Sequence, residues 1–255
     1  MSRLNSKTLA QIEKLLQSKS YSEVIRQLDE IRHSITDRED YAYCCILHTE
    51  AAIHLGDYSN TLIDQAIDAL RSTRHVSNYA RAKFLKGWLL ALTGQFWDAK
   101  EPFLESYAHY LRCQDINGIA RTLNWLSYVA LKTGDARSAI ENLTRAIDVT
   151  LKGGDERAAA KIAHNLAHAH YGRGEIGKSL SLYRRFAVSR RVHGLKPFLN
   201  YCYMSALPLA LLGHINEARN SLTLCKPYLH NYIRENAIYF ENVGLISILA
   251  GDFCE

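Results

Sequence analysis

A short turn of the form Gly-x-apolar recurs along this chain at nearly constant spacing. Its glycines lie 38, 40, 40, 39 and 38 residues apart. The segment Lys19-Ser20-Tyr21, which lies 37 residues before the first of these glycines, fits the series as a copy whose glycine has been replaced. A period in this range is typical of a solenoid built from stacked helical units, and such arrays present binding surfaces far more often than they carry out catalysis. The turns read Gly56-Asp57-Tyr58, Gly94-Gln95-Phe96, Gly134-Asp135-Ala136, Gly174-Glu175-Ile176, Gly213-His214-Ile215 and Gly251-Asp252-Phe253.

Helical spacing of apolar residues surrounds each turn. Before Gly94 the sequence has Phe84, Leu85, Trp88 and Leu89, which follow the i, i+3, i+4 pattern of one helix face. The same pattern resumes after the turns, and nothing alternates with period two for long enough to be a strand. Each unit is therefore predicted to be helix, tight turn, helix, with the glycine in the left-handed conformation. An Asp, Asn or Ser close to the turn is expected to cap the following helix. Two prolines, Pro102 and Pro208, fall inside predicted helices.

The composition is that of a foldable water-soluble protein. Apolar residues make up 47% of the 255 residues and charged residues 22%, and the net charge is +5. Because the positive charge is spread along the chain, it points only weakly to an acidic partner. The six cysteines form no C-x-x-C pair, so we expect buried, reduced thiols and a cytoplasmic location. The N-terminus has no signal-peptide pattern, and no apolar run approaches the ~18 residues of a membrane helix.

Small residues recur at fixed offsets from the turns, and they carry a resemblance to the tetratricopeptide-repeat (TPR) family. Seven residues before the turn glycine stand Gly87, Ser127, Ala167, Ala206 and Gly244. Five residues after it stand Ala99, Ala139, Ser179 and Ala218. Small side chains at these offsets let the two helices of a pair cross closely. The period exceeds the 34 residues usual for TPRs, and it resembles that of the TPR-like sensor arrays of bacterial regulatory proteins.

Counting from the turns gives the boundaries of the predicted units. The resemblance implies an all-α, right-handed superhelical solenoid of antiparallel helix pairs, formed by a single domain over residues 1–255. Because a solenoid that ends in half a repeat leaves an apolar face uncapped, we expect the sequence to be part of a longer protein, with a lone capping helix as the alternative. The pairs fall at 5–41, 42–79, 80–119, 120–159, 160–198 and 199–236, and a final unpaired helix falls at 237–250.

TPR arrays use the first helix of each pair to line a concave groove, so the resemblance makes these helices the candidate binding surface. Thirteen residues before successive turns stand Arg81, Arg121 and Lys161. Cations beside aromatic rings and amides suit an extended acidic peptide, because they pair with carboxylates while the rings cover apolar side chains. The alternative is that the cations are solvated at the starts of their helices. The candidate partner-binding residues are Arg81, Trp88, Arg121, Asn124, Tyr128, Lys161, Asn165 and His168.

Three narrower interpretations are disfavoured by the sequence. A TPR carboxylate clamp needs an Asn where the chain has Trp125, although Lys161 and Asn165 fit part of that pattern. His164 and His168 lie one helical turn apart, but no further ligands accompany them, so no metal site is expected. Gly172-Arg173-Gly174-Glu175-Ile176-Gly177 spells G-x-G-x-x-G after a helix rather than a strand, which removes the basis for phosphate binding.

An arginine-rich run, from Tyr183-Arg184-Arg185-Phe186 to Ser189-Arg190-Arg191, lies on one predicted second helix. Two explanations fit this run equally well. It forms a stripe that binds nucleic acid or an acidic protein, or it is a solvated convex face. Direct nucleic-acid binding is not expected, because the overall charge is modest.

We therefore expect a non-catalytic scaffold that binds a protein or peptide and carries no cofactor. No motif supplies a nucleophile, a base or a set of metal ligands, which argues against an enzyme. The resemblance implies the sensory or interaction part of a larger cytoplasmic, bacterial signalling or transcription regulator. The alternative is a free-standing adaptor that assembles a protein complex. We also expect a homodimer formed through the C-terminal end, and no membrane partner.

Overall fold

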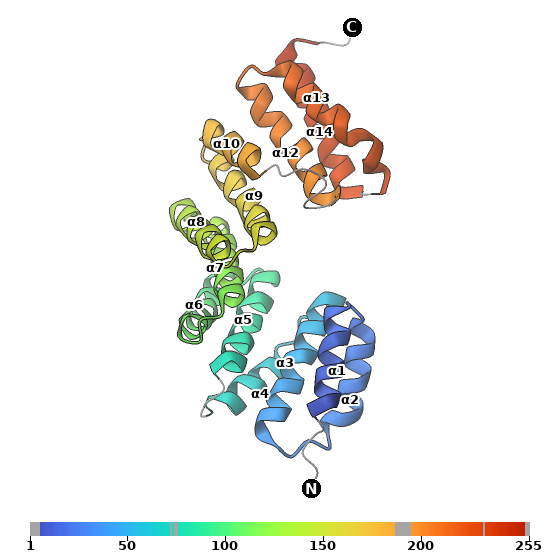
Figure 1. Ribbon diagram of the computed structural model, residues 1–255, viewed down its shortest axis with the longest axis vertical. Coiled ribbons are helices and arrows are strands. Elements are labelled where there is room, and N and C mark those ends of the chain that lie inside the picture. The colour runs from blue at the N-terminus through green and yellow to red at the C-terminus, as the bar shows by residue number, and fades with distance from the viewer. Residues whose placement is uncertain (1–5, 72, 74–75, 187–194, 232, 253–255) are drawn as a thin grey trace. The chain divides into compact units, whose positions relative to one another are not determined.

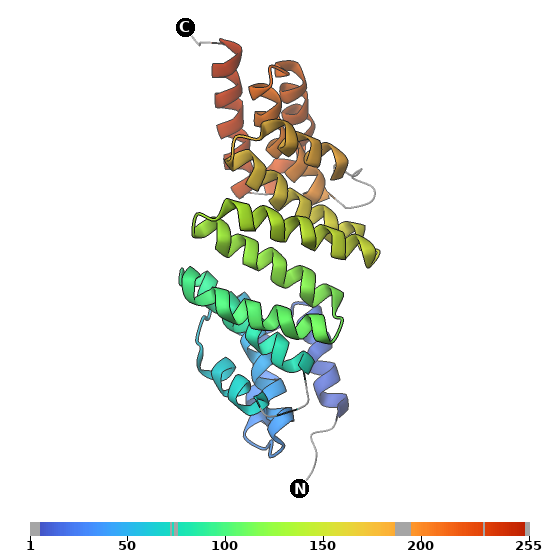
Figure 2. The same ribbon diagram turned by 90° about the vertical axis from the view of Figure 1, so that its left-hand side faces the viewer.

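The computed structural model describes residues 6–71, 73, 76–186, 195–231 and 233–252. Within these ranges the regular structure consists of α-helices and one 3-10 helix, with no strand, so the predicted all-α class is confirmed. Within each of the two units described below, consecutive helices pack against one another, most of them across short turns, as Figures 1 and 2 show. The helices are α1 (Ser6–Gln17), α2 (Tyr21–Arg32), α3 (Arg38–Leu55), α4 (Thr61–Leu70), α5 (Val76–Leu92), α6 (Phe96–Arg112), α7 (Ile116–Lys132), α8 (Ala136–Lys152), α9 (Glu156–Gly172), α10 (Ile176–Phe186), α12 (Leu195–Leu211), α13 (Ile215–Cys225), η1 (Lys226–Asn231) and α14 (Ile233–Ala250).

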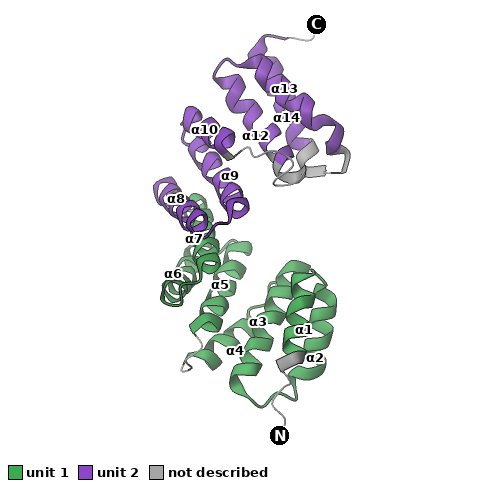
Figure 3. Ribbon diagram, in the orientation of Figure 1, with its two compact units in different colours: residues 1–134 green, residues 135–255 purple. Residues whose placement is uncertain are grey.

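The structure divides into two compact units, Met1–Gly134 and Asp135–Glu255 (Figure 3). Unit 1 contains α1 to α7 and unit 2 contains α8 to α14. The division falls at the Gly134 turn, inside the predicted repeat 120–159. A single domain over 1–255 stays a prediction.

From the second repeat onward, the first helix of each repeat begins earlier than its predicted unit. These helices begin at residues 38, 76, 116, 156, 195 and 233, each four residues before the predicted starts at 42, 80, 120, 160, 199 and 237. Caps fix three of these starts. The side chains of Asp37, Asp115 and Asp155 accept hydrogen bonds from backbone N–H groups at the beginnings of α3, α7 and α9. Apolar periodicity places the middle of such helices well, but the polar cap defines their first residue.

The turn residues adopt the predicted left-handed conformation. All six turn glycines have positive φ, from +74° at Gly174 to +87° at Gly56. Lys19 occupies the equivalent place with φ +63°, although it carries a Cβ. Its N–H donates to the Leu16 carbonyl and that of Ser20 donates to the Leu15 carbonyl, the same pattern found at the Gly94 turn. The segment Lys19-Ser20-Tyr21 is therefore confirmed as a copy of the turn that lacks glycine.

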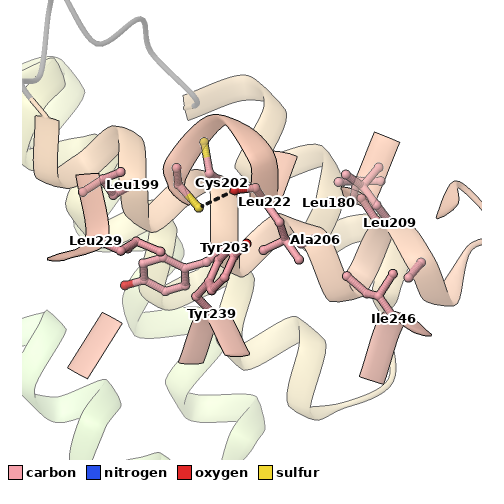
Figure 4. Packing of buried hydrophobic residues seen from close by; sticks show 13 residues of the cluster. Leu180, Leu199, Cys202, Tyr203, Ala206, Leu209, Leu222, Leu229, Tyr239 and Ile246 are labelled. Carbon is pink, nitrogen blue, oxygen red and sulfur yellow. Dashed lines mark hydrogen bonds between the residues drawn. The ribbon is translucent and has the colours of Figure 1, made fainter. Parts of the chain in front are cut away.

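Each unit has its own buried apolar core. In unit 1 one cluster joins α1, α2 and α3 through Ile12, Leu28 and Leu47, all fully buried. In unit 2 a cluster runs from α10 to α14 and includes Leu199, Cys202 and Leu222 (Figure 4). Pro102 and Pro208 lie inside α6 and α12, as predicted.

Candidate partner-binding surface

Three aromatic side chains from α5 and α7 contact one another on the first helices of unit 1. The ring centroids of Trp88 and Trp125 lie 5.7 Å apart, and those of Trp125 and Tyr128 lie 5.4 Å apart in an edge-to-face arrangement. Phe96, at the start of α6, continues the series 6.0 Å from Tyr128. Tyr128 is 38% exposed, so the series reaches the surface. We call Trp88, Trp125, Tyr128 and Phe96 the aromatic surface.

The aromatic surface continues onto α3 and α2. His54, on the last turn of α3, lies edge-on to Trp88 at 5.4 Å, and Tyr21 of α2 stacks on His54 at 4.4 Å. Beneath the surface, Phe103 of α6 stacks against Trp125 at 6.3 Å. These contacts fix the exposed rings, because each is held by a ring from a neighbouring helix.

Arg121 adds a positive charge on the same side of α7. Its guanidinium lies 4.1 Å from the centroid of the Phe84 ring, and it donates a 3.4 Å hydrogen bond to the Tyr110 hydroxyl. Arg121 is exposed and Asn124 is half-buried. Since Arg121, Asn124 and Tyr128 are spaced three and four residues apart on one helix, they share a face. The structure thus brings four predicted residues, Trp88, Arg121, Asn124 and Tyr128, into one region of unit 1.

Arg81 is placed differently from Arg121, although both stand thirteen residues before a turn. Its guanidinium lies 2.7 Å from a Glu50 carboxylate oxygen and 3.3 Å from a Glu13 oxygen, linking α5 to α3 and α1. Burial lowers the pKa of Arg81, but the two carboxylates raise it more, and the net shift is upward. The two predicted cations are therefore not equivalent, because the charge of Arg81 is already paired inside unit 1.

The sequence contains the reason for this difference. Six residues before the preceding turn, the repeat before Arg81 has Glu50, whereas the repeat before Arg121 has Trp88. A carboxylate at that offset forms an ion pair with the cation of the next repeat, while an aromatic residue leaves that cation exposed.

Three predicted residues lie in unit 2, on α9. Lys161, Asn165 and His168 are all exposed, and their spacing places them on one face of the helix. His164 lies beside this face, with its ring 5.7 Å from that of Tyr183. Burial, with a smaller contribution from the charge of His168, lowers the pKa of His164 to about 4. His164 is therefore neutral at pH 7.

Two further side chains near the sequence motifs, His170 and Arg184, form ion pairs with carboxylates. His170 pairs with Glu175, Nδ1 to Oε2 at 2.6 Å, and Arg184 pairs with Glu217 at 3.0 Å. Arg190 and Arg191 lie outside the described residues. No group of three or more His, Cys, Asp or Glu side chains in the described ranges is arranged to hold a metal ion. No helix in that part of the chain is long and apolar enough to cross a membrane.

Most cysteines in the described residues are part of the core, and Cys254 lies outside those residues. Cys44, Cys45, Cys202 and Cys225 are buried and free, as predicted, whereas Cys113 is exposed, contrary to the prediction. Burial raises the pKa of Cys44 and Cys202 to about 12 and that of Cys225 to about 11. These thiols stay protonated and do not supply nucleophiles.

Comparisons with known proteins identify the fold. No protein-family model matches the sequence, and no curated protein matches it either. Among solved structures, the Signal Transduction ATPase with Numerous Domains (STAND) protein PH0952 from Pyrococcus horikoshii, which has a tetratricopeptide-repeat sensor, is similar with a TM-score of 0.82 at 11% identity. That match covers 96% of this chain and 38% of the STAND protein. The chain has a TPR-like fold.

Two further solved structures support this TPR-like assignment. A Rap protein complexed with Competence and Sporulation Factor has a TM-score of 0.69 at 15% identity, covering 96% of this chain and 76% of that one. Aspartyl phosphate phosphatase F from Bacillus subtilis has a TM-score of 0.69 at 16% identity, covering 94% and 69%. At these identities the likeness shows the fold alone, and it confirms the helical repeat architecture inferred from the turns.

Sequence reasoning missed part of the aromatic surface. Trp125 lies at an offset of the candidate surface, next to Asn124, but is not among the predicted partner-binding residues, and no binding role is predicted for His54 or Tyr21. His54 directly precedes the Leu55-Gly56 turn, and Tyr21 opens the helix after the Lys19 turn. Aromatic and imidazole rings beside turns of adjacent repeats are the signal that could have found them.

Proposed function

We propose that this chain is a non-catalytic TPR-like scaffold that binds a protein or peptide segment on the aromatic surface of unit 1. The observation that carries the proposal is the contact series Trp88–Trp125–Tyr128 beside the stacked Arg121 guanidinium. Aromatic and arginine side chains are the residues most often dominant in binding energy at protein interfaces. Here they are held by neighbouring rings, so little side-chain entropy remains to be lost on binding.

The chemistry of the surface defines the partner. Tyr128 and Trp125 offer apolar ring area for an aliphatic or aromatic side chain. Arg121 offers a guanidinium for a carboxylate, and the Lys132 ammonium, 5.6 Å from the Tyr128 ring, adds a second positive charge. The partner segment therefore carries an acidic residue next to an apolar one. The exposed face of α9, with Lys161, Asn165 and His168, is proposed as a second contact surface in unit 2.

The biological setting that fits best is the sensory or interaction part of a cytoplasmic, bacterial signalling or transcription regulator. Its support is the likeness to a STAND protein with a TPR sensor and to a Rap protein in complex with Competence and Sporulation Factor. A free-standing adaptor is the alternative. It is favoured by the division into two compact units, each with its own exposed first-helix face, because two faces can hold two partners.

Peptide selection tests the proposal without a known partner. A random peptide library displayed on phage is selected against the whole chain, and the affinities of the enriched peptides are measured by fluorescence anisotropy. We expect these peptides to share an acidic residue beside an aromatic or aliphatic one. Arg121→Glu and Tyr128→Ala should each lower the affinity at least about tenfold, which corresponds to about 1.4 kcal/mol.

Two controls separate this surface from general stickiness. Trp97, on α6, is 73% exposed and lies outside the aromatic surface, and Arg112 ends the same helix. Trp97→Ala and Arg112→Glu make matched changes in apolar area and in charge, and both should leave the affinity unchanged. Equal losses in the control variants, or no loss in Arg121→Glu and Tyr128→Ala, would contradict the proposed site.

A further inference from the structure

Four side chains of α7, Arg121, Trp125, Tyr128 and Lys132, form one stripe along the helix, which we call the α7 stripe. Successive members are separated by four, three and four residues, so they share one face of the helix. At a rise of about 1.5 Å per residue, the two cations at the ends lie about 16 Å apart along the helix axis. The two rings lie between them. Arg121, Tyr128 and Lys132 are exposed and Trp125 is half-buried, so the stripe is open to a ligand along its length.

The charges of α5 and α7 are unbalanced. Together these two helices contain five Lys or Arg side chains and no Asp or Glu. Within the described residues, Arg121 and Lys132 form no ion pair with a carboxylate, so the α7 stripe keeps two positive charges that a ligand can neutralise. The other three cations pair with carboxylates of neighbouring helices: Arg81 with Glu50 at 2.7 Å, Lys83 with Glu105 at 2.9 Å and Lys86 with Asp64 at 2.9 Å.

Neighbouring rings hold both of these charges in place. The Arg121 guanidinium lies 4.1 Å from the centroid of the Phe84 ring, and its hydrogen bond to the Tyr110 hydroxyl uses one of its five N–H donors. The Lys132 ammonium lies 5.6 Å from the centroid of the Tyr128 ring. Each cation is therefore positioned by the protein and still has N–H groups that can bind a carboxylate.

The hydrogen-bonding groups of the α7 stripe are mostly donors. Arg, Lys and Trp side chains donate and cannot accept, so Tyr128 alone among the four side chains carries an acceptor. An extended peptide on this surface buries amide N–H groups that find no acceptor, and each such group costs free energy. Proline has no N–H to bury. A polyproline II helix has no internal hydrogen bonds, so its carbonyls are free to accept, whereas an α-helix uses its carbonyls internally.

Building on the proposed function, we propose that the α7 stripe binds a proline-rich segment in the polyproline II conformation with a carboxylate at each end. The prolines pack on Trp125 and Tyr128, since proline-rich segments dock on aromatic-lined surfaces. The two carboxylates pair with Arg121 and Lys132. At about 3.1 Å per residue, a span of about 16 Å places these carboxylates about five residues apart. Because the conformation is formed before binding, little backbone entropy is lost.

A labelled peptide that contains Glu-Pro-Pro-Leu-Pro-Glu has its two glutamates at this separation and serves as the probe. Fluorescence anisotropy with the whole chain should show saturable binding. A peptide with alanine in place of the prolines keeps the charges but restores the N–H groups, so it should bind at least about tenfold more weakly. Tyr128→Ala should weaken binding of the proline peptide by a similar factor, and Trp97→Ala should leave it unchanged.

Lys132→Glu tests the second charge, and Lys152→Glu is its matched control. Both lysines are exposed, and Lys152 ends α8 as Lys132 ends α7, so both variants should keep their fold in circular dichroism. Lys132→Glu should weaken binding of the proline peptide about three- to tenfold, and Lys152→Glu should not change it. Replacing one of the two peptide glutamates with lysine should restore the affinity for Lys132→Glu while weakening binding to the wild type.

Two results would overturn the proposal. One is a proline peptide that does not bind, and the other is an alanine peptide that binds equally well or better, which would indicate a helical ligand. The phage-selected peptides separate these failures from a failure of the proposed function. If Tyr128→Ala weakens their binding while the proline peptide does not bind, the aromatic surface stands and its proline-rich ligand is wrong. If Tyr128→Ala affects neither kind of peptide, both proposals are wrong.

Discussion

Replacing Arg81 with methionine is expected to destabilise unit 1, because the Glu50 carboxylate then loses its guanidinium partner. The side chains of Arg81 and Glu50 are only 20% and 15% exposed. Breaking a fully buried ion pair by removing one member costs about 3–5 kcal/mol. Since water reaches a fifth of the Arg81 side chain, we expect about 2–3 kcal/mol here. Methionine keeps most of the apolar stem, so lost packing adds little.

Thermal unfolding followed by circular dichroism measures the effect. For a chain of this length, a loss of about 2–3 kcal/mol lowers the Tm by about 4–12 °C. Arg121→Met should cost less, about 0.5–1 kcal/mol, because that guanidinium loses a stacking contact with Phe84 but leaves no buried carboxylate behind.

The double variant Arg81→Met/Glu50→Met provides the critical comparison. Replacing both members of a buried pair with apolar residues is often neutral or stabilising, so the Tm should return close to that of the wild type. Additive losses in the double variant, or an Arg81→Met protein as stable as Arg121→Met, would refute the conclusion that Arg81 is a structural cation.

Three further predictions concern the backbone and pH. Lys19→Gly should stabilise the chain by about 0.5–1 kcal/mol, because Lys19 has φ +63° and glycine accepts that conformation without a steric penalty; an unchanged or lower urea midpoint would contradict this. Gly87→Ala should destabilise the chain by about 1–3 kcal/mol because the added Cβ clashes with Phe103. Gly244→Ala should stabilise it by up to about 1 kcal/mol, because the added Cβ meets nothing and alanine favours a helix. If both variants shift the urea midpoint in the same direction, the described packing is contradicted. The pKa of His164 falls from 6.5 to about 4 on folding, so its neutral form contributes stability that is present above about pH 6.5 and is lost as the pH falls toward 4. Between pH 7 and 5 the wild type should lose about 1–2 kcal/mol more than His164→Phe in urea titrations, and equal losses would contradict this.

The fold could be predicted from the sequence because its main determinants are local. A glycine that must adopt positive φ, a small residue at each helix crossing and an apolar face of helical period repeat at fixed offsets, so each copy strengthens the others. The first residues of the helices could be predicted less well. Asp115 and Asp155 cap helices through side-chain hydrogen bonds, and the apolar pattern carries no information about these bonds.

The candidate site was predictable only in part, because the offsets identify a face but not the partners of each side chain. Arg81 and Arg121 share an offset, yet a carboxylate from the preceding repeat pairs with one and an aromatic ring stacks with the other. Trp125 depends on rings from α5, α6 and its own helix. Such contacts between repeats arise from packing over long sequence separations.

Hydroxyl-radical footprinting with mass spectrometry tests the central claim most directly. The whole chain is labelled with and without a peptide enriched in the phage selection, and the oxidation of individual aromatic residues is compared. Binding on the aromatic surface should protect Tyr128 and Trp125 while leaving Trp97 on α6 as reactive as before. Protection of Trp97 without protection of Tyr128 and Trp125 would place the partner elsewhere and contradict the proposed site.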